Sequence, residues 1–267
     1  MLPTNFKTIA IAISASIFSL ASVNSFAQTP EEKGLAIAKE AKQRDLGWGD
    51  SQTTLKMVLR NAAGQESTRE IRTKTLEVND DGDKSLNIFD HPRDVKGTAF
   101  LSFSHPVGAD DQWLYLPALK RVKRIASRNK SGPFMGSEFA YEDLASFEVE
   151  KYTYKFLREE PCSAGTCFVI EQYPVDKYSG YTRLINWIDK EEYRSWKTEF
   201  YDRRNSLLKT LTVVDFKQYL GKYWRATAMK MVNHQTKKNT DLVWDDYQFR
   251  TGLTDADFNK NTLKRAR

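Results

Sequence analysis

The chain has 267 residues, of which 40% are hydrophobic, 28% are charged and 12% are aromatic, and its formal net charge is +6. This composition excludes a protein with many membrane spans, a collagen-like fibre and a low-complexity disordered chain. Because 15 Phe, 12 Tyr and 6 Trp residues stand against only 13 Gly and 8 Pro, we expect a well-packed core.

The first 27 residues have the pattern of a cleavable signal peptide. Lys7 supplies a short positive region, and residues 9–21 form an uncharged apolar run. Ser25 and Ala27 place small residues at the −3 and −1 positions of a cleavage site. An apolar run this short does not span a bilayer of about 30 Å, which argues against a membrane anchor. We therefore expect a signal peptide over residues 1–27 and one exported domain over residues 28–267. No cysteine lies near the junction, so this domain is expected to be periplasmic and not lipidated.

Residues 30–46 are the best helix candidate in the chain. Leu35, Ala38 and Leu46 fall at helical spacing. Pro30 suits a first turn and Gly47 suits a helix stop.

From about residue 52 onward the dominant hydrophobic period is two, which is typical of strands. Tyr152, Tyr154 and Phe156 alternate with polar residues, and the same alternation occurs at residues 99–103, 185–187 and 196–200. Short turn signals separate these runs, at residues 61–64, 80–83, 164–165, 202–205 and 237–239. Such short connections join antiparallel neighbours, and no helix recurs at the spacing of a parallel α/β fold. We expect a mainly β domain with one large, curved antiparallel sheet, partly closed on itself.

Residues 127–146 are the exception to this period. Gly132, Pro133 and Gly136 interrupt any regular element there. The stretch is the longest non-strand insertion in the sheet region, and long loops are often functional. The alternative is a surface crossover that ends in a short helix near residues 141–146.

Cys162 and Cys167 are the only two cysteines, and both lie in the exported part. In an oxidising compartment they predict a disulfide across a tight hairpin loop, worth roughly 2 kcal/mol on the chain-entropy model. Two cysteines without a nearby pair of histidines do not complete a zinc site, and the Cys-x-x-Cys spacing of a redox pair is absent.

A basic cluster follows the run Trp113–Pro117. If residues 119–125 form a strand, its cations lie on both faces, which suits an edge strand or one beside an open, wet mouth. Charged edges also prevent sheets from aggregating. Genomic DNA is not present outside the cytoplasm, so we expect no nucleic-acid partner and assign this charge to lipid headgroups or to a membrane partner. The candidate residues for that contact are Lys120, Arg121, Lys123, Arg124 and Arg128.

Signals for catalysis are weak. The three histidines lie apart in the sequence, and there is no Gly-x-Ser-x-Gly elbow, His-Glu-x-x-His pair or P-loop. Ser137, next to Gly136, is not enough to identify a nucleophile. We expect a protein that is not an enzyme and that needs no cofactor and no metal.

The central segment closely resembles the signature of the outer membrane lipoprotein-sorting proteins, which belong to the LolA/LolB-like superfamily. The resemblance lies in residues 113–125 (WLYLPALKRVKRI), 134–139 (FMGSEF) and 141–144 (YEDL). Residues 96–98 before an apolar strand and the ending over residues 257–265 also match the family pattern. The resemblance extends over most of the chain, from about residue 33 to residue 265.

The resemblance implies an unclosed, highly curved antiparallel β-barrel around a hydrophobic cavity, with helices that plug or cover it. It implies a periplasmic carrier or binding protein for a lipid or an acylated ligand. Members of this branch are found alongside RND-type exporters, which implies an envelope transporter of that type as a partner, with peripheral membrane contact.

A carrier of this kind needs one face of each strand to line its cavity, because each buried methylene is worth about 0.8 kcal/mol. An alternative function is a ligand-free interaction module that docks through its basic segment and residues 127–146 on an envelope protein or RND-type transporter. By alternation the cavity candidates are Tyr152, Tyr154, Phe156, Trp187, Trp196, Phe200, Met229 and Met231.

Overall fold

The computed structural model describes Met1, residues 28–245 and residues 247–265. Apart from Met1, the predicted signal peptide therefore lies outside the described residues. Within the described ranges, no helix combines the length and the apolar character needed to cross a membrane.

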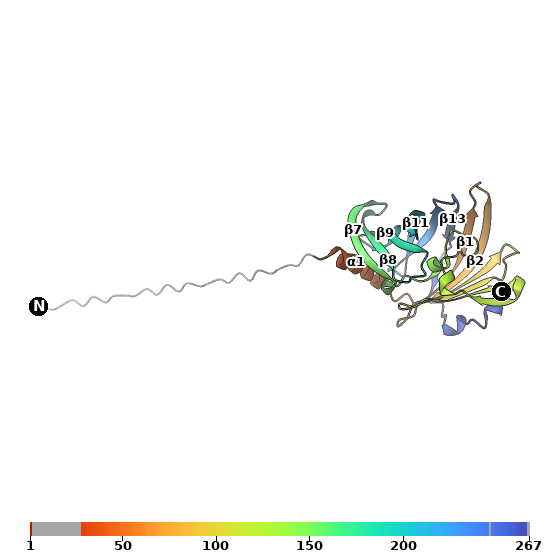
Figure 1. Ribbon diagram of the computed structural model, residues 1–267. Coiled ribbons are helices and arrows are strands. Elements are labelled where there is room, and N and C mark those ends of the chain that lie inside the picture. The colour runs from red at the N-terminus through yellow and green to blue at the C-terminus, as the bar shows by residue number, and fades with distance from the viewer. Residues whose placement is uncertain (2–27, 246, 266–267) are drawn as a thin grey trace.

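The predicted N-terminal helix is confirmed as α1, Pro30–Arg44. It begins at a capping box, in which the Thr29 hydroxyl accepts a hydrogen bond from the Glu32 amide and the Glu32 carboxylate accepts one from the Thr29 amide. Helix α1 packs on strand β7 (Tyr152–Cys162), as Figure 1 shows. The approach is close, since a Cβ atom on Gly34 would lie 2.8 Å from the backbone nitrogen of Phe156.

The rest of the chain is mainly β, as the period of two predicts. Within residues 28–245 and 247–265, six short turns of 3-10 helix connect the strands or follow them: η1 (Pro117–Leu119), η2 (Ser127–Asn129), η3 (Tyr141–Leu144), η4 (Val149–Lys151), η5 (Asp255–Asp257) and η6 (Leu263–Arg265). The strands are β1 (Asp50–Arg60), β2 (Glu66–Leu76), β3 (Lys84–His91), β4 (Ala99–Phe103), β5 (Asp111–Leu116), β6 (Arg121–Arg124), β7 (Tyr152–Cys162), β8 (Gly165–Pro174), β9 (Tyr181–Asp189), β10 (Ser195–Asp202), β11 (Leu207–Tyr219), β12 (Tyr223–Asn233), β13 (Asn239–Trp244) and β14 (Gln248–Phe249).

The fourteen strands of the described residues belong to one antiparallel sheet, in the order β6-β5-β4-β3-β2-β1-β13-β12-β11-β10-β9-β8-β7, with β14 paired to β1. The chain thus builds two meanders, and the pairing of β1 with β13 joins them. Strands β6 and β7 form the two free edges, so the sheet is unclosed. The sequence left two positions open for the basic segment, an edge strand or a strand beside an open mouth, and β6 lies at the edge.

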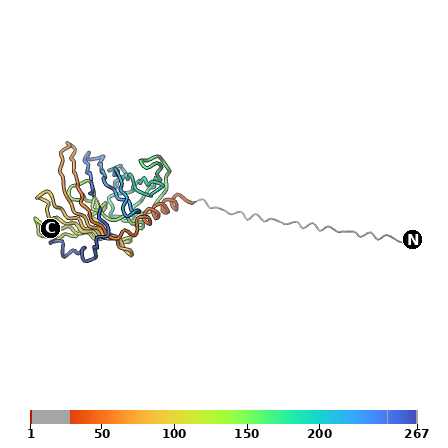
Figure 2. Tube along the Cα trace, turned by 180° about the vertical axis from the view of Figure 1, so that it is seen from behind, coloured from red at the N-terminus to blue at the C-terminus, as the bar shows by residue number. Residues whose placement is uncertain are grey.

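The sheet curves strongly around an interior space (Figure 1). Register shifts interrupt five of its strand pairs, between β2 and β3, β7 and β8, β9 and β10, β10 and β11, and β11 and β12. Such bulges increase local twist and bend a sheet. Four of the five lie between β7 and β12, where the sheet wraps toward α1; in Figure 2 α1 runs along that side of the molecule.

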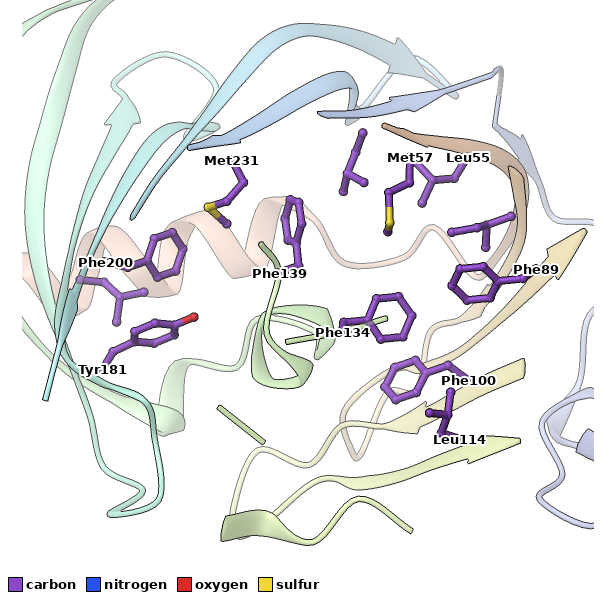
Figure 3. Packing of buried hydrophobic residues seen from close by; sticks show 13 residues of the cluster. Leu55, Met57, Phe89, Phe100, Leu114, Phe134, Phe139, Tyr181, Phe200 and Met231 are labelled. Carbon is purple, nitrogen blue, oxygen red and sulfur yellow. The ribbon is translucent and has the colours of Figure 1, made fainter. Parts of the chain in front are cut away.

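Residues 127–146 contain η2 and η3, and η3 confirms the short helix that the sequence predicts near residues 141–146. The middle of the segment folds into the interior, and we call residues 127–146 the plug segment. Phe134 and Phe139 project from it into the interior of the curved sheet and are 2% and 4% exposed (Figure 3). The Phe134 ring lies 5.1 Å from the Phe100 ring and 5.8 Å from the Phe89 ring, measured between centroids. The plug segment therefore fills the half of the interior that β1–β5 enclose.

The predicted disulfide is confirmed. Cys162 and Cys167 are bonded across the turn between β7 and β8, with their Cα atoms 5.7 Å apart. Cys167 is fully buried, so the bridge also belongs to the hydrophobic packing under these strands.

Candidate functional site

A cavity of about 430 Å³ lies inside the curved sheet, beside the plug segment. Strands β7–β12, helix α1 and the plug segment contribute its walls. The volume lies within the range of about 300–1,000 Å³ that small-molecule sites occupy. Figure 3 shows Tyr181, Phe200 and Met231 pointing from the sheet toward Phe139 of the plug segment.

The concave wall consists of cross-strand rows of side chains. Across β9 to β12, Asn186 pairs with Thr198, Thr198 with Leu211, and Leu211 with Met231. All four residues line the cavity, which shows that this row faces inward. The row is polar on β9 and β10 and apolar on β11 and β12.

The rim of the cavity carries exposed apolar side chains. Val107 is 82% exposed, Val175 is 60% exposed and Phe147 is 39% exposed, yet all three line the cavity. Single exposed apolar residues are ordinary, whereas several around one concave opening mark a site for an apolar partner.

The plug segment is held beside the cavity by a buried ion pair. The Lys209 ammonium donates to the Asp143 carboxylate at 2.6 Å, and both side chains are less than a tenth exposed. The Tyr181 hydroxyl also donates to Asp143, at 2.8 Å. Burial, with Asp143 nearby, raises the pKa of Tyr181 well above its usual value, so the hydroxyl remains a donor.

A second buried carboxyl group fixes the loop before β9. Glu142 accepts hydrogen bonds from the Ser179 hydroxyl and from the Gly180 amide, each at 2.8 Å. Burial raises the pKa of Glu142, and these two hydrogen bonds act in the opposite direction.

The charged groups on the cavity wall are predominantly acidic. The two lysines that line it are already paired, Lys130 with Asp176 at 2.7 Å and Lys151 with Asp110. The lining carboxyl groups belong to Asp110, Glu142, Asp143, Glu150 and Asp176.

Three of the eight predicted cavity residues line the cavity: Tyr152, Phe200 and Met231. Met229 packs against the central core cluster on the same face but is not in the lining. Tyr154 and Phe156 pack in the cluster under α1 with Ile37 and Ala38.

The structure places Trp187 and Trp196 elsewhere, in the cluster that contains the disulfide. The Trp187 indole donates to Glu160, and the Trp196 ring packs against Phe216 at 4.9 Å between centroids. On β9 the alternation expected from the sequence is present, but Leu184, Asn186 and Ile188 line the cavity, and Trp187 does not. The predicted period is correct and the predicted face of these two residues is not. On the face that they occupy, the Lys197 ammonium lies over the Trp187 ring and the Arg194 guanidinium lies near the Trp196 ring.

The predicted basic residues lie away from the cavity, since none of the five is part of its lining. Four of them, Lys120, Arg121, Lys123 and Arg124, are exposed along the free edge at β6, and Arg128 is exposed in η2. Arg124 pairs with Asp111, whereas within the described part of the chain no carboxylate pairs with Arg121 or Lys123.

Ser137 has a structural place in the plug segment. Its hydroxyl donates to the Phe134 carbonyl at 2.7 Å, and it is 2% exposed. Histidine side chains hydrogen-bond elsewhere, His105 to Asp81 and His234 to Thr210.

Four polar side chains on the concave wall were not identified from the sequence, and we call them the polar ledge: Gln172, Asn186, Ser195 and Thr198. The Asn186 carbonyl oxygen accepts from the Ser195 hydroxyl at 2.5 Å and from the Thr198 hydroxyl at 3.3 Å. The one available signal was Asn186 between Leu184 and Ile188, a polar residue at an inward position of a strand.

Known proteins match nearly the whole of the described domain. A family model with the description "Uncharacterized protein" matches residues 81–265. A crystal structure described as an outer membrane lipoprotein-sorting protein domain from Vibrio parahaemolyticus is 64% identical, with a TM-score of 0.87, over 88% of this chain and 100% of that chain. A search of curated proteins found no match.

Two more distant structures share the architecture. A DUF1329 family protein from Desulfovibrio piger is 29% identical, with a TM-score of 0.83, over 88% of this chain and 99% of that chain. A LolA superfamily protein from Nitrosomonas europaea is 22% identical, with a TM-score of 0.68, over 85% of this chain and 98% of that chain. The last of these is a likeness of fold alone, and it confirms the LolA-like architecture that the sequence predicts.

Proposed function

The chain belongs to the outer membrane lipoprotein-sorting protein family, whose fold is LolA-like, and on this premise we propose that it carries a lipid or an acylated ligand in the periplasm. The proposed role is binding and transfer, without catalysis. The predicted signal peptide would deliver the protein to that compartment.

The observation that carries this proposal is the cavity with its apolar rim. An acyl chain of about fifteen carbons exposes on the order of 10 kcal/mol of apolar surface to water. Leu211, Met231 and Phe139 offer an apolar wall inside the cavity, and Val107 and Val175 extend it to the surface. A chain that enters past this rim would remain covered during transfer.

A fluorescence titration tests the proposal with N-phenyl-1-naphthylamine, an uncharged apolar dye that brightens out of water. The protein over residues 28–267 should bind the dye, and Leu211→Trp, which fills the cavity, should weaken binding about tenfold or more, or about 1.4 kcal/mol. The control is Val214→Trp, since Val214 is a 63% exposed residue of the same strand and lies outside the lining. No dye binding by the parent protein, or equal binding by both variants, would contradict the proposal.

A partner of the RND-type envelope transporter class belongs to the same proposal. What supports it is the exposed basic edge at β6, which lies off the cavity and leaves the mouth free during docking. Anionic headgroups are the alternative contact for Arg121 and Lys123, through peripheral membrane binding.

This same edge favours the second candidate function, a ligand-free module that docks on an envelope protein. A free strand edge offers unpaired backbone groups to a partner strand. On this alternative the purified protein holds no lipid, and Arg121→Glu with Lys123→Glu abolishes capture of the partner.

A further inference from the structure

The polar ledge is the least expected feature of a cavity proposed for acyl chains. Gln172 is 4% exposed and lines the cavity, yet among the described residues its side-chain amide has no hydrogen-bond partner. Its amide atoms are not among the fully enclosed unpartnered atoms of the described residues, so the amide is open to the cavity, where water or a ligand can bond to it.

Asn186 provides a second free amide group next to the first. Its side chain engages the Ser195 and Thr198 hydroxyls through one end of the amide. The other end has no partner in the described chain, and whichever way the amide is turned, one of its ends stays free. Gln172 pairs with Leu184, and Asn186 pairs with Ile170, so the two amides are diagonal neighbours on β8 and β9.

The ledge has a defined place between the rim and the apolar wall. Gln172 is three residues along the chain from the exposed Val175, a distance of about 10 Å in an extended strand. Asn186 and Thr198 continue across the sheet into Leu211 and Met231. This row is therefore polar on β9 and β10 and apolar on β11 and β12, and Leu184, Ile188 and Phe200 add apolar surface beside its polar end.

The charges around the ledge discriminate between kinds of polar ligand. A carboxylate ligand would find no unpaired ammonium group on the wall, because Lys130 and Lys151 are paired and the remaining charged lining residues are acidic. An uncharged carbonyl, in contrast, can accept from one free amide N–H without meeting a like charge.

From this arrangement we propose that the polar ledge binds the uncharged carbonyl of an acyl ester or acyl amide, whose chain then lies against Leu211, Met231 and Phe139. This inference rests on the proposed carrier function and names the ligand class. It distinguishes esters and amides from free fatty acids and plain hydrocarbons.

Competition against bound N-phenyl-1-naphthylamine tests the proposal, with three competitors of equal chain length: 1-monolauroylglycerol, laurate and dodecane. The parent protein should prefer the ester over both others by about tenfold or more. Gln172→Met with Asn186→Leu should lose the preference for the ester over laurate and dodecane. The matched control is Gln248→Met, since Gln248 is exposed on β14.

The outcomes distinguish the ligand class assigned to the polar ledge from the carrier function itself. If the parent protein binds the dye but shows no preference for the ester, or if the double variant keeps the preference, the ledge assignment is wrong and the carrier function stands. If the parent protein binds neither dye nor competitor, the carrier function itself fails. If circular dichroism shows that the double variant does not fold, Thr198→Val replaces it, because this variant removes one ledge hydroxyl alone. It should reduce the preference for the ester over laurate and dodecane.

Discussion

Asp83 is a half-buried carboxyl group in the turn before β3. Its backbone amide donates to the Ser146 hydroxyl, which in turn donates to Glu148. Glu148 pairs with Lys42 of helix α1 at 3.0 Å. This chain of contacts connects α1 to the end of the plug segment, and the charges of Lys42 and Glu148 also act on the Asp83 carboxyl group.

Burial raises the pKa of Asp83 to about 6; Lys42 opposes this shift, and Glu148 and Glu77 add to it. In an unfolded chain the pKa of an aspartate is about 3.9. Between these values the folded protein holds more protons at this site than the unfolded chain, so this group makes the free energy of unfolding fall as pH rises from about 4 to about 6.

Asp83→Asn should therefore stabilise the protein at pH 7.5 by about 2 kcal/mol, and the gain should shrink toward zero at pH 4. The asparagine keeps an oxygen that can accept from the Val78 amide, as Asp83 does. Urea unfolding at the two pH values measures this, with Asp80→Asn, an exposed residue of the same turn, as the control. An equal gain at both pH values would show that burial of this charge is not the cause.

At the scale of single residues, the sequence predicts for some side chains, but not for others, whether they line the cavity. Phe200 and Met231 line the cavity as expected. Trp187 does not, because alternation defines two faces of a strand without showing which one is concave. Gln172 could not have been found, since its free amide is recognisable only once its neighbours are placed.

The plug segment is the element that shapes the site. Its backbone pairs with itself at Pro133 and Ala140, and the Lys209 ammonium holds it to β11 through Asp143 and the Glu138 carbonyl. Phe134 then packs against aromatic rings from β3 and β4. The plug segment thereby divides the interior into a filled half and the cavity.

Phe134→Ala should cost about 3–5 kcal/mol of unfolding free energy, because it removes a fully packed ring and leaves a cavity. Phe147→Ala is the matched control, since this ring is 39% exposed at the rim, and its loss should cost about 1 kcal/mol or less. Urea unfolding of the two variants decides the point. Equal costs would mean that the plug segment contributes no more to the fold than the rim does.

Elements with a regular hydrophobic period were predictable from the sequence, and the position of the plug segment was not. The helix and the strands follow from spacing, caps and turns, as α1 with its Thr29 capping box illustrates. The plug segment has no period, so its sequence left a surface crossover and a functional loop equally open. Its inward position follows from tertiary contacts of Phe134 and Phe139, which no local pattern encodes.

At the scale of the whole molecule, the sheet is two meanders that meet at β1 and β13 and remain open at β6 and β7. The antiparallel, curved character was predictable from the period of two and from the family resemblance. The strand order was not, because the pairing of β1 with β13 joins segments distant in the sequence. That pairing joins strands β1–β5, which enclose the plug segment, to strands β7–β12, which enclose the cavity.

The arrangement separates two surfaces that the proposed function requires. The apolar rim surrounds the mouth beside α1, and the basic strand β6 lies at the opposite end of the strand order. A carrier of this form can dock through one surface while ligand passes through the other.

Extraction of the protein purified from its native cells without detergent tests the central claim most directly. Mass spectrometry of the organic extract should find an acyl ester or acyl amide in stoichiometric amount, and Leu211→Trp prepared in parallel should carry much less. Val214→Trp should retain the full load. An extract free of lipid from the parent protein, above all one obtained while an envelope partner copurifies, would contradict the carrier function.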